Sequence, residues 1–332
     1  MATLSGLDRR RLLRSCLALG AGTLAAAPLT FHRKPEINKP RPVSRVAILN
    51  VESYSDRLEQ LLMDGLSLFK LEVKGKKVLL KPNLVEFLAG KEVTTHPVLV
   101  GAAAECFLRL GAKRVVVADG SGHQRDTEGL LVDTGLQEQL RQRRVEFVDL
   151  NRDDLTKTKL RSSYTGLGHL WLPNTVLDSD FVVSMPKVKT HHWAGVTLSL
   201  KNMFGIVPGM KYGWPKNLLH WRGISESVVD ICATVPIDFV IADGIVAMEG
   251  NGPLHGSSRE LGVLVLADDP VAADATASRI MTLSPGRFPH LWEARFLGNI
   301  CTSDIQQLAA SIESVRQPFR VLPAFSSCRM SE

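Results

Sequence analysis

Cationic side chains recur in a short segment whose pattern is typical of an extended strand. Lys187, Lys189 and His191 alternate along it, so all three lie on the same side of that strand. Lys201 and Asn202 follow a little further on. Lysines that converge without acidic neighbours in sequence repel one another unless an anion lies among them, so the pattern predicts recognition of a phosphate or carboxylate. The alternative is a set of loop lysines in solvent.

A second polar group comes from a distant part of the chain, where Lys81 and Asn83 directly follow an apolar run. We expect both groups to form one site for a small anionic ligand. The hypothesis assigns catalysis to Lys187, His191 and Lys201, and ligand binding to Lys81, Asn83, His96, Ser121, Lys189 and Asn202. In this site His191 acts as a general acid or base. Strand alternation allows only one of His191 and His192 to face the ligand.

Acidic residues indicate a different chemistry. Asp119, Asp243 and Glu249 lie at or after the ends of apolar runs, and carboxylates beside a phosphate suit a magnesium-type ion with oxygen ligands. The sequence does not name a cofactor, and a divalent metal ion held by these three residues is the hypothesis. The structural alternative is that Asp243 caps a turn and that Asp274 begins a helical turn.

Short β-branched runs alternate with segments of helical periodicity along the chain. The expected strands are 46–51, 78–80, 115–118, 145–150, 181–185, 239–242 and 263–267, and the expected helices include 224–233 and 271–281. Another helix is expected after Pro97, which suits a first helical turn, and before Gly111, which suits the left-handed position after a helix. This order predicts an α/β fold with a mainly parallel sheet flanked by helices, as one domain or two α/β lobes.

Polar motifs follow directly after five of the apolar runs. They begin at Lys81, Asp119, Pro186, Asp243 and Asp268. Because the carboxyl ends of parallel strands lie on one edge of a sheet, and ligands bind there in open α/β folds, these motifs are expected to converge. The runs lack strict polar alternation, which favours strands buried on both faces.

Several motifs in a fixed order are similar to those of the family called domain of unknown function 362. The motifs are residues 81–85 (KPNLV), 94–97 (TTHP), 186–191 (PKVKTH), 200–205 (LKNMFG), 249–253 (EGNGP) and 269–274 (DPVAAD). The resemblance covers roughly residues 75–285. It implies no settled reaction, although members of the family are often described as iron–sulfur proteins.

Cysteine spacing does not support an iron–sulfur cluster in this chain. Cys106, Cys232, Cys301 and Cys328 are far apart in sequence and form no C-x-x-C motif. The ferredoxin-like cysteine cluster found in many members of the family is therefore not present in this sequence, and no iron–sulfur cofactor is expected.

The positive charge of the chain is concentrated near its N-terminus. The formal net charge is +6, but residues 1–45 contain nine Lys or Arg and two Asp or Glu, a balance of +7, which leaves −1 for the rest. The remaining chain lacks the basic surface that nucleic-acid binding needs, so no nucleic-acid partner is expected.

Residues 8–14 (DRRRLLR) precede an apolar, Ala-rich stretch and match the pattern of a twin-arginine export signal. We expect a signal peptide over 1–30, a linker over 31–45 and one α/β domain over 46–325. The protein is then a client of the twin-arginine export machinery, located in the periplasm or tethered to the outer side of the membrane. Tethering, and any membrane contact, requires that the signal is not cleaved, a point that Pro28 after Ala25–Ala27 leaves open.

The leading hypothesis is an exported enzyme that binds an anionic small molecule, phosphorylated or not, through lysines at strand ends, with or without a metal ion. The alternative is a non-catalytic protein that carries a cofactor or assists a redox partner. The sequence names neither the substrate nor the reaction.

Overall fold

A ten-stranded sheet organises this protein, for which a computed structural model describes residues 41–55, 57–122 and 126–330. The main strand order is β12-β1-β11-β10-β7-β2-β3-β4, and β8 and β9 extend it beside β10. The bounds are β1 Ser44–Asn50, β2 Lys77–Pro82, β3 Arg114–Asp119, β4 Glu146–Asp149, β7 Phe181–Met185, β8 Lys187–His191, β9 Gly195–Thr197, β10 Phe239–Glu249, β11 Ser257–Ala267 and β12 Ile305–Ala309. The expected export signal at 1–30 lies outside the described residues.

The sheet is mainly parallel, as the sequence predicts. Strands β4, β3, β2, β7 and β10 pair in parallel, one after another. Strand β11 is antiparallel to both β10 and β1, because it follows β10 through a short connection that reverses the chain. A separate two-stranded sheet joins β5 Leu155–Lys159 to β6 His169–Pro173.

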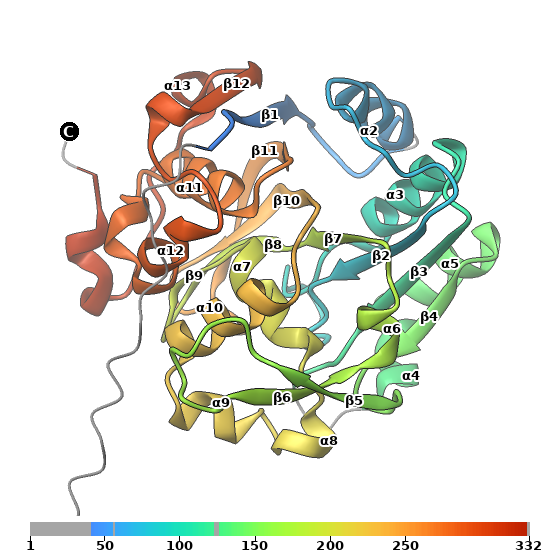
Figure 1. The fold of residues 1–332 in the computed structure, drawn as a ribbon. Helices are drawn as coiled ribbons and strands as arrows, with labels where there is room; N and C mark the ends of the chain where they lie inside the picture. The colour runs from blue at the N-terminus through green and yellow to red at the C-terminus, as the bar shows by residue number, and fades with distance from the viewer. Residues whose placement is uncertain (1–40, 56, 123–125, 331–332) are drawn as a thin grey trace, which may run out of the picture. The chain divides into compact units, whose positions relative to one another are not determined.

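Both faces of the sheet are buried, which is the reason that its strands lack polar alternation. In β2, Leu79 belongs to one apolar core, while Val78 and Leu80 belong to the other. Helices α2 Leu58–Ser67, α3 Pro97–Arg109 and α5 Leu136–Arg143 pack on one face, and α7 Ser199–Asn202, α10 Ile224–Thr234, α11 Pro270–Ile280 and α12 Pro289–Glu293 lie on the other (Figure 1). The remaining α-helices of the described residues are α4 Thr127–Asp133, α6 Asn174–Leu177, α8 Gly209–Tyr212, α9 Asn217–Trp221 and α13 Ile312–Val315.

Helix α3 begins and ends as its sequence signals predict. Pro97 is its first residue, and the His96 ring accepts a hydrogen bond from the backbone N–H of Val98 at 3.3 Å. Gly111, just beyond the helix, has a φ of 90°, a conformation that costs glycine little. The α3 segment therefore carries its own start and stop signals.

Two expectations about the organisation of the chain need correction. The ten strands of the main sheet are continuous within a single compact unit, so the alternative of two α/β lobes is wrong. Strand β1 begins at Ser44, which is buried, so the last two residues of the expected linker belong to the sheet. They pair with β12 in parallel, a contact that the sequence pattern of the linker does not reveal.

Candidate functional site

A cavity of about 230 Å³ opens where β2, β3 and β8 end and where α7 begins. We call it the lysine cavity, because four lysines line it: Lys81, Lys189, Lys201 and Lys216. Its wall also includes Asn83, Asp119, His191, His192, Trp193, Thr197, Asn202, Phe204, Gly205 and His220. The structure thus brings together residues that lie more than a hundred positions apart in the sequence.

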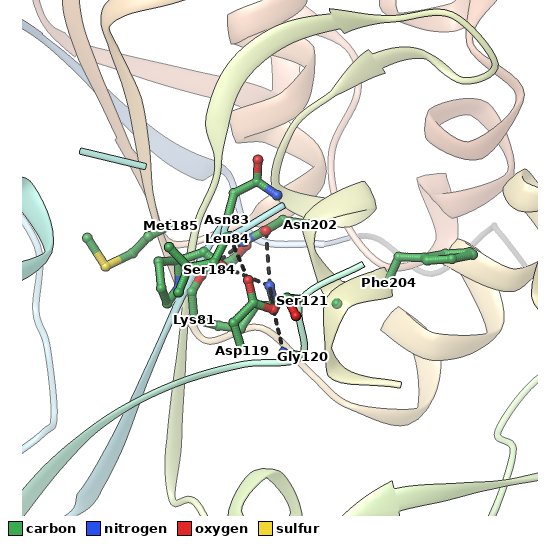
Figure 2. A network of polar contacts seen from close by, with 12 residues as sticks. Lys81, Asn83, Leu84, Asp119, Gly120, Ser121, Ser184, Met185, Asn202 and Phe204 are labelled. Carbon is green, nitrogen blue, oxygen red and sulfur yellow. Dashed lines mark hydrogen bonds and ion pairs between the residues drawn. The ribbon is translucent and has the colours of Figure 1, made fainter. Parts of the chain in front are cut away.

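Lys81 forms a buried ion pair at the base of the lysine cavity. Its Nζ lies 2.6 Å from Asp119 Oδ1 and donates to Asn202 Oδ1 at 3.2 Å (Figure 2). Asp119 also accepts the backbone N–H groups of Leu84 at 2.7 Å and Gly120 at 2.8 Å. The Asp119 carboxylate is therefore fully engaged in joining the ends of β2 and β3.

Gly205 is required where the chain passes over this ion pair. A Cβ atom at this position would lie 2.5 Å from both Asp119 Oδ1 and Lys81 Nζ. The Leu-Lys-Asn-Met-Phe-Gly motif therefore ends in a residue without a side chain because any other residue would collide with the pair.

Lys189 and Lys201 have no carboxylate partner among the described residues. Lys189 is fully buried and donates to Val93 O at 2.7 Å. Lys201 Nζ lies 4.3 Å from the centre of the Phe204 ring, a cation–π contact. Burial lowers the pKa of Lys189 well below its ordinary value, and the neighbouring Lys187 and Lys201 lower it further. Burial and then Lys81 lower the pKa of Lys201 to about 8.

Lys216 is a cavity residue that the sequence does not single out. Its Nζ donates to Gly120 O, Phe204 O and Gly205 O, each at 3.1 Å. Burial lowers the pKa of Lys216 to about 7. The only signal was its position in the Gly-, Trp- and Lys-rich stretch between His191 and Trp221, whose lack of a clean period is typical of functional segments.

His191 is held as one tautomer. Its Nδ1 accepts the backbone N–H groups of Trp193 at 3.0 Å and Ala194 at 3.1 Å, so the proton of the neutral ring is on Nε2. Burial, followed by the charge of Lys201, lowers the pKa of His191. The ring therefore has an N–H at Nε2 that can donate to a ligand, and the lone pair of Nδ1 is occupied, which makes it a poor general base.

His191 and His192 both line the cavity, so the expectation that only one would face it is wrong. Strand β8 ends at His191, and the alternation of a strand stops there. The ring centres of the two histidines are 4.8 Å apart. The row of ring contacts extends to Trp193, His220 and Phe204, with neighbouring ring centres 4.5 to 5.4 Å apart. This arc of rings forms an apolar wall beside the lysines.

Three buried polar atoms at or next to the cavity have no hydrogen-bond partner among the described residues. They are Asn83 Oδ1, Thr197 Oγ1 and Ser121 Oγ. Asn83 and Thr197 line the cavity, and Ser121 lies between the lining residues Gly120 and Gly122. Buried polar atoms normally have partners, so the two that line the cavity, on Asn83 and Thr197, are available to a ligand, whereas Ser121 lies behind the lining.

Asp274 fixes the short helix that carries Lys201 and Asn202. Its carboxylate accepts the backbone N–H groups of Ser199 at 2.7 Å and Leu200 at 2.9 Å, at the start of α7. Burial raises the pKa of Asp274 to about 8. The Asp-Pro-Val-Ala-Ala-Asp motif on α11 therefore positions the cavity wall and does not line it.

Lys187, His96 and Asp243 lie outside the lysine cavity, in a second group that we call the Lys187 cluster: Tyr54, Glu92, His96, Lys187 and Asp243. Lys187 Nζ lies 3.1 Å from Asp243 Oδ2 and 3.1 Å from Glu92 Oε2, and donates to Tyr54 Oη at 2.9 Å. Tyr54 Oη donates to Asp243 Oδ1 at 2.6 Å, and the His96 backbone N–H donates to Asp243 Oδ2 at 2.9 Å. Lys187 is therefore neutralised, which corrects its assignment to the anion site.

The three carboxylates of the metal hypothesis are not assembled. Asp119 pairs with Lys81 and Asp243 pairs with Lys187, while Glu249 accepts from the Arg320 guanidinium at 2.8 Å. Within the part of the chain that the structure describes, no group of three His, Cys, Asp or Glu residues is placed to hold a metal ion. Each carboxylate is engaged by its own cation, so the hypothesis of a site built from these three residues needs correction.

The fold and the cavity define an α/β protein with a lysine-rich pocket at the carboxyl edge of its sheet. The chain belongs to the family described as domain of unknown function 362, whose model matches residues 78–279. It is 31% identical over 227 residues to a thylakoid-associated protein from Synechocystis sp., covering 68% of this chain and 68% of that protein. The resemblance inferred from the motifs is confirmed.

Two solved structures are more remotely similar. The lactate racemase apoprotein from Thermoanaerobacterium thermosaccharolyticum matches with a TM-score of 0.40 at 11% identity, over 66% of this chain and 54% of that one. A protein from Thermotoga maritima matches with a TM-score of 0.37 at 13% identity, over 63% and 55%. This chain therefore spans about half the length of either structure.

Proposed function

We propose that the protein is an enzyme whose lysine cavity binds a small anionic molecule. The observation that carries the proposal is the presence of Lys189 and Lys201 in one cavity, where no carboxylate of the described residues pairs with either of them. The Lys189 amine is fully buried and the Lys201 amine is partly buried; when both are protonated they repel each other, and an anion between them offsets that cost. A phosphate or carboxylate supplies that compensation, and Thr197 adds a free hydroxyl.

The size and walls of the cavity support a ligand of few atoms. Its volume of about 230 Å³ is below the range of roughly 300–1,000 Å³ of pockets for drug-sized ligands. The lysines provide charge, and the arc of rings from His191 to Phe204 provides an apolar side. The ligand is therefore a short acid or phosphate with an apolar or carbonyl end.

The test is a calorimetric titration of the purified full chain with inorganic phosphate, pyruvate and propionate. We expect at least one of these anions to bind and the Lys201→Met variant to lose that binding. Lys157, exposed on β5, provides the matched control, because Lys157→Met removes the same charge away from the cavity. No binding of any anion, or equal losses in both variants, would refute an anion site.

We also propose that residues 1–30 direct export by the twin-arginine route, and that the protein is then found beside a membrane. Arg9 and Arg10 before an apolar stretch support the first part, and the name of the thylakoid-associated relative supports the second. Among the described residues, no helix is long and apolar enough to cross the bilayer. Replacing Arg9 and Arg10 by Lys should retain the protein in the cytoplasm, as fractionation with a marker for each compartment would measure.

A further inference from the structure

Lys201 differs from the other three lysines of the cavity in having no hydrogen-bond acceptor. Lys81 has Asp119, Lys189 has Val93 O, and Lys216 has three carbonyl groups. Lys201 makes no hydrogen bond or ion pair with any residue that the structure describes, and its amine contacts the Phe204 ring at 4.3 Å. No acceptor among the described residues therefore holds the Lys201 amine in its protonated form, and the lone pair of the neutral amine is accessible to a ligand.

A lysine in an apolar setting beside another cation has the environment of an amine nucleophile. The pKa of Lys201 falls to about 8 through burial and the charge of Lys81, so an appreciable share of the amine is unprotonated near neutral pH. Burial lowers the pKa of Lys216 further, to about 7, but its amine is held by three carbonyl oxygens and is not free to reach a ligand.

We infer that Lys201 forms a Schiff base with a small aldehyde or ketone that carries a carboxylate, in the lysine cavity. The inference rests on the proposed anion site, in which Lys189, the Thr197 hydroxyl and the positive charge at position 201 together hold the carboxylate. His191, fixed with its proton on Nε2, donates a hydrogen bond to the carbonyl oxygen and polarises it. It is a positioning and polarising group and takes no proton.

The step is balanced without any further reagent. Lys201 Nζ, as the neutral amine, attacks the carbonyl carbon, and a new C–N bond forms. The carbonyl oxygen receives the two protons of the amine and leaves as water when the C–O bond breaks, which gives the imine. No electrons are exchanged with an outside partner. The imine formed in this way is neutral; its nitrogen then takes up one proton from the solvent, and the resulting positive charge lies next to the substrate carboxylate.

The experiment is reductive trapping on the full chain with pyruvate and sodium cyanoborohydride, followed by peptide mass mapping. We expect a single reduced adduct on Lys201 and its loss when propionate competes, since propionate has the carboxylate but no carbonyl. Lys201→Met should lose both adduct and binding. Lys201→Arg keeps the charge, so it should lose the adduct while it still binds propionate.

The outcomes separate this inference from the anion site. If pyruvate binds in calorimetry but no adduct forms, or the adduct maps to Lys189, Lys216 or equally to surface lysines, the Schiff-base inference is wrong and the anion site stands. If phosphate alone binds and no adduct forms, the Schiff-base inference is likewise wrong; if none of phosphate, pyruvate and propionate binds and no adduct forms, both are wrong. Lys157→Met provides the background level of labelling in every series.

Discussion

The Lys187 cluster and the lysine cavity lie close together in this molecule, and they differ in whether a lysine meets a carboxylate. In the Lys187 cluster a fully buried lysine meets two carboxylates and a phenol within 3.1 Å. In the lysine cavity, Lys189 donates to the backbone carbonyl of Val93, and Lys201 contacts the Phe204 ring. The first group neutralises its charge inside the protein, whereas Lys189 and Lys201 have no carboxylate partner among the described residues. Burial of a lysine alone therefore does not identify a binding site; what distinguishes the two groups is whether a carboxylate pairs with the lysine.

The sequence places these two groups two residues apart. Lys187 and Lys189 are both on β8 and both fully buried. Lys187 pairs with Asp243 because β8 runs beside β10 in that register, whereas Lys189 lies opposite Met248. A shift of the register between Asp243 and Met248 changes which side chains meet. The difference in function thus depends on strand pairing, which residue type and spacing do not encode.

The largest effect should come from removing the cation of the Lys187 cluster. Lys187→Met leaves Asp243 buried without its ammonium partner, and we expect a loss of about 3–5 kcal/mol in the free energy of unfolding. Urea denaturation measures it. The double variant Lys187→Met with Asp243→Asn is the control, because it removes the orphaned charge and should recover part of the loss. An unchanged urea midpoint for the single variant would show that the cluster does not stabilise the fold.

A middle-sized effect should come from the glycine over the Lys81–Asp119 ion pair. Gly205→Ala places a Cβ 2.5 Å from both charged atoms, and overpacking of this kind costs about 1–3 kcal/mol. Gly122→Ala is a matched control in the same cavity, because its Cβ would meet nothing within 4 Å; we expect a change within about 0.5 kcal/mol. Equal urea midpoints for the two variants would mean that the approach at Gly205 is not tight.

Much of the fold follows from local signals in the sequence. The expected strand at 181–185 matches β7, and Pro97 and Gly111 bound α3 as their stereochemistry requires. What the sequence does not reveal is long-range pairing. The continuity of one sheet across 150–170 depends on the parallel pairing of β2 with β7, a contact between segments about a hundred residues apart.

Part of the candidate site could be predicted from the sequence. Strand-end logic brings Lys81, Asn83 and Lys189 to one edge, and the structure places them in the lining of one cavity. It fails for Lys187 and Asp243, because β10 continues beyond Asp243 and the pairing of β8 with β10 brings these two residues together. Lys216 was missed because it stands in a loop with no periodic pattern, and only the folded loop brings its amine to Gly120 O.

A smaller effect, of opposite sign, should come from the lysine cavity. Lys201→Met removes a partly buried charge that has no hydrogen-bond or carboxylate partner among the described residues, so we expect the free energy of unfolding at neutral pH to stay equal or to rise, by about 1 kcal/mol at most. Anion binding should disappear in the same variant. A strong loss of stability in urea would instead show that Lys201 is a structural residue, comparable with Lys187.

The most subtle expectation is the pH dependence of the stability difference between the wild type and Lys201→Met. The pKa of Lys201 is about 8 in the folded protein and 10.5 in its ordinary state. Between these values the unfolded chain binds more protons than the folded one, so the contribution of this group to stability increases as the pH rises.

Below pH 8 both states carry the charge, and the wild type bears the full cost of burying it; above pH 10.5 neither does, and the cost is gone. The stability advantage expected for Lys201→Met should therefore shrink across pH 8 to 10.5. Lys216, whose pKa of about 7 Lys201 also lowers, becomes easier to protonate in the variant, which adds to the variant's advantage below pH 8. Urea midpoints of both proteins across this range provide the measurement. A difference that is constant with pH would mean that Lys201 is not desolvated in the folded protein, and the contrast with the Lys187 cluster would then concern pairing alone.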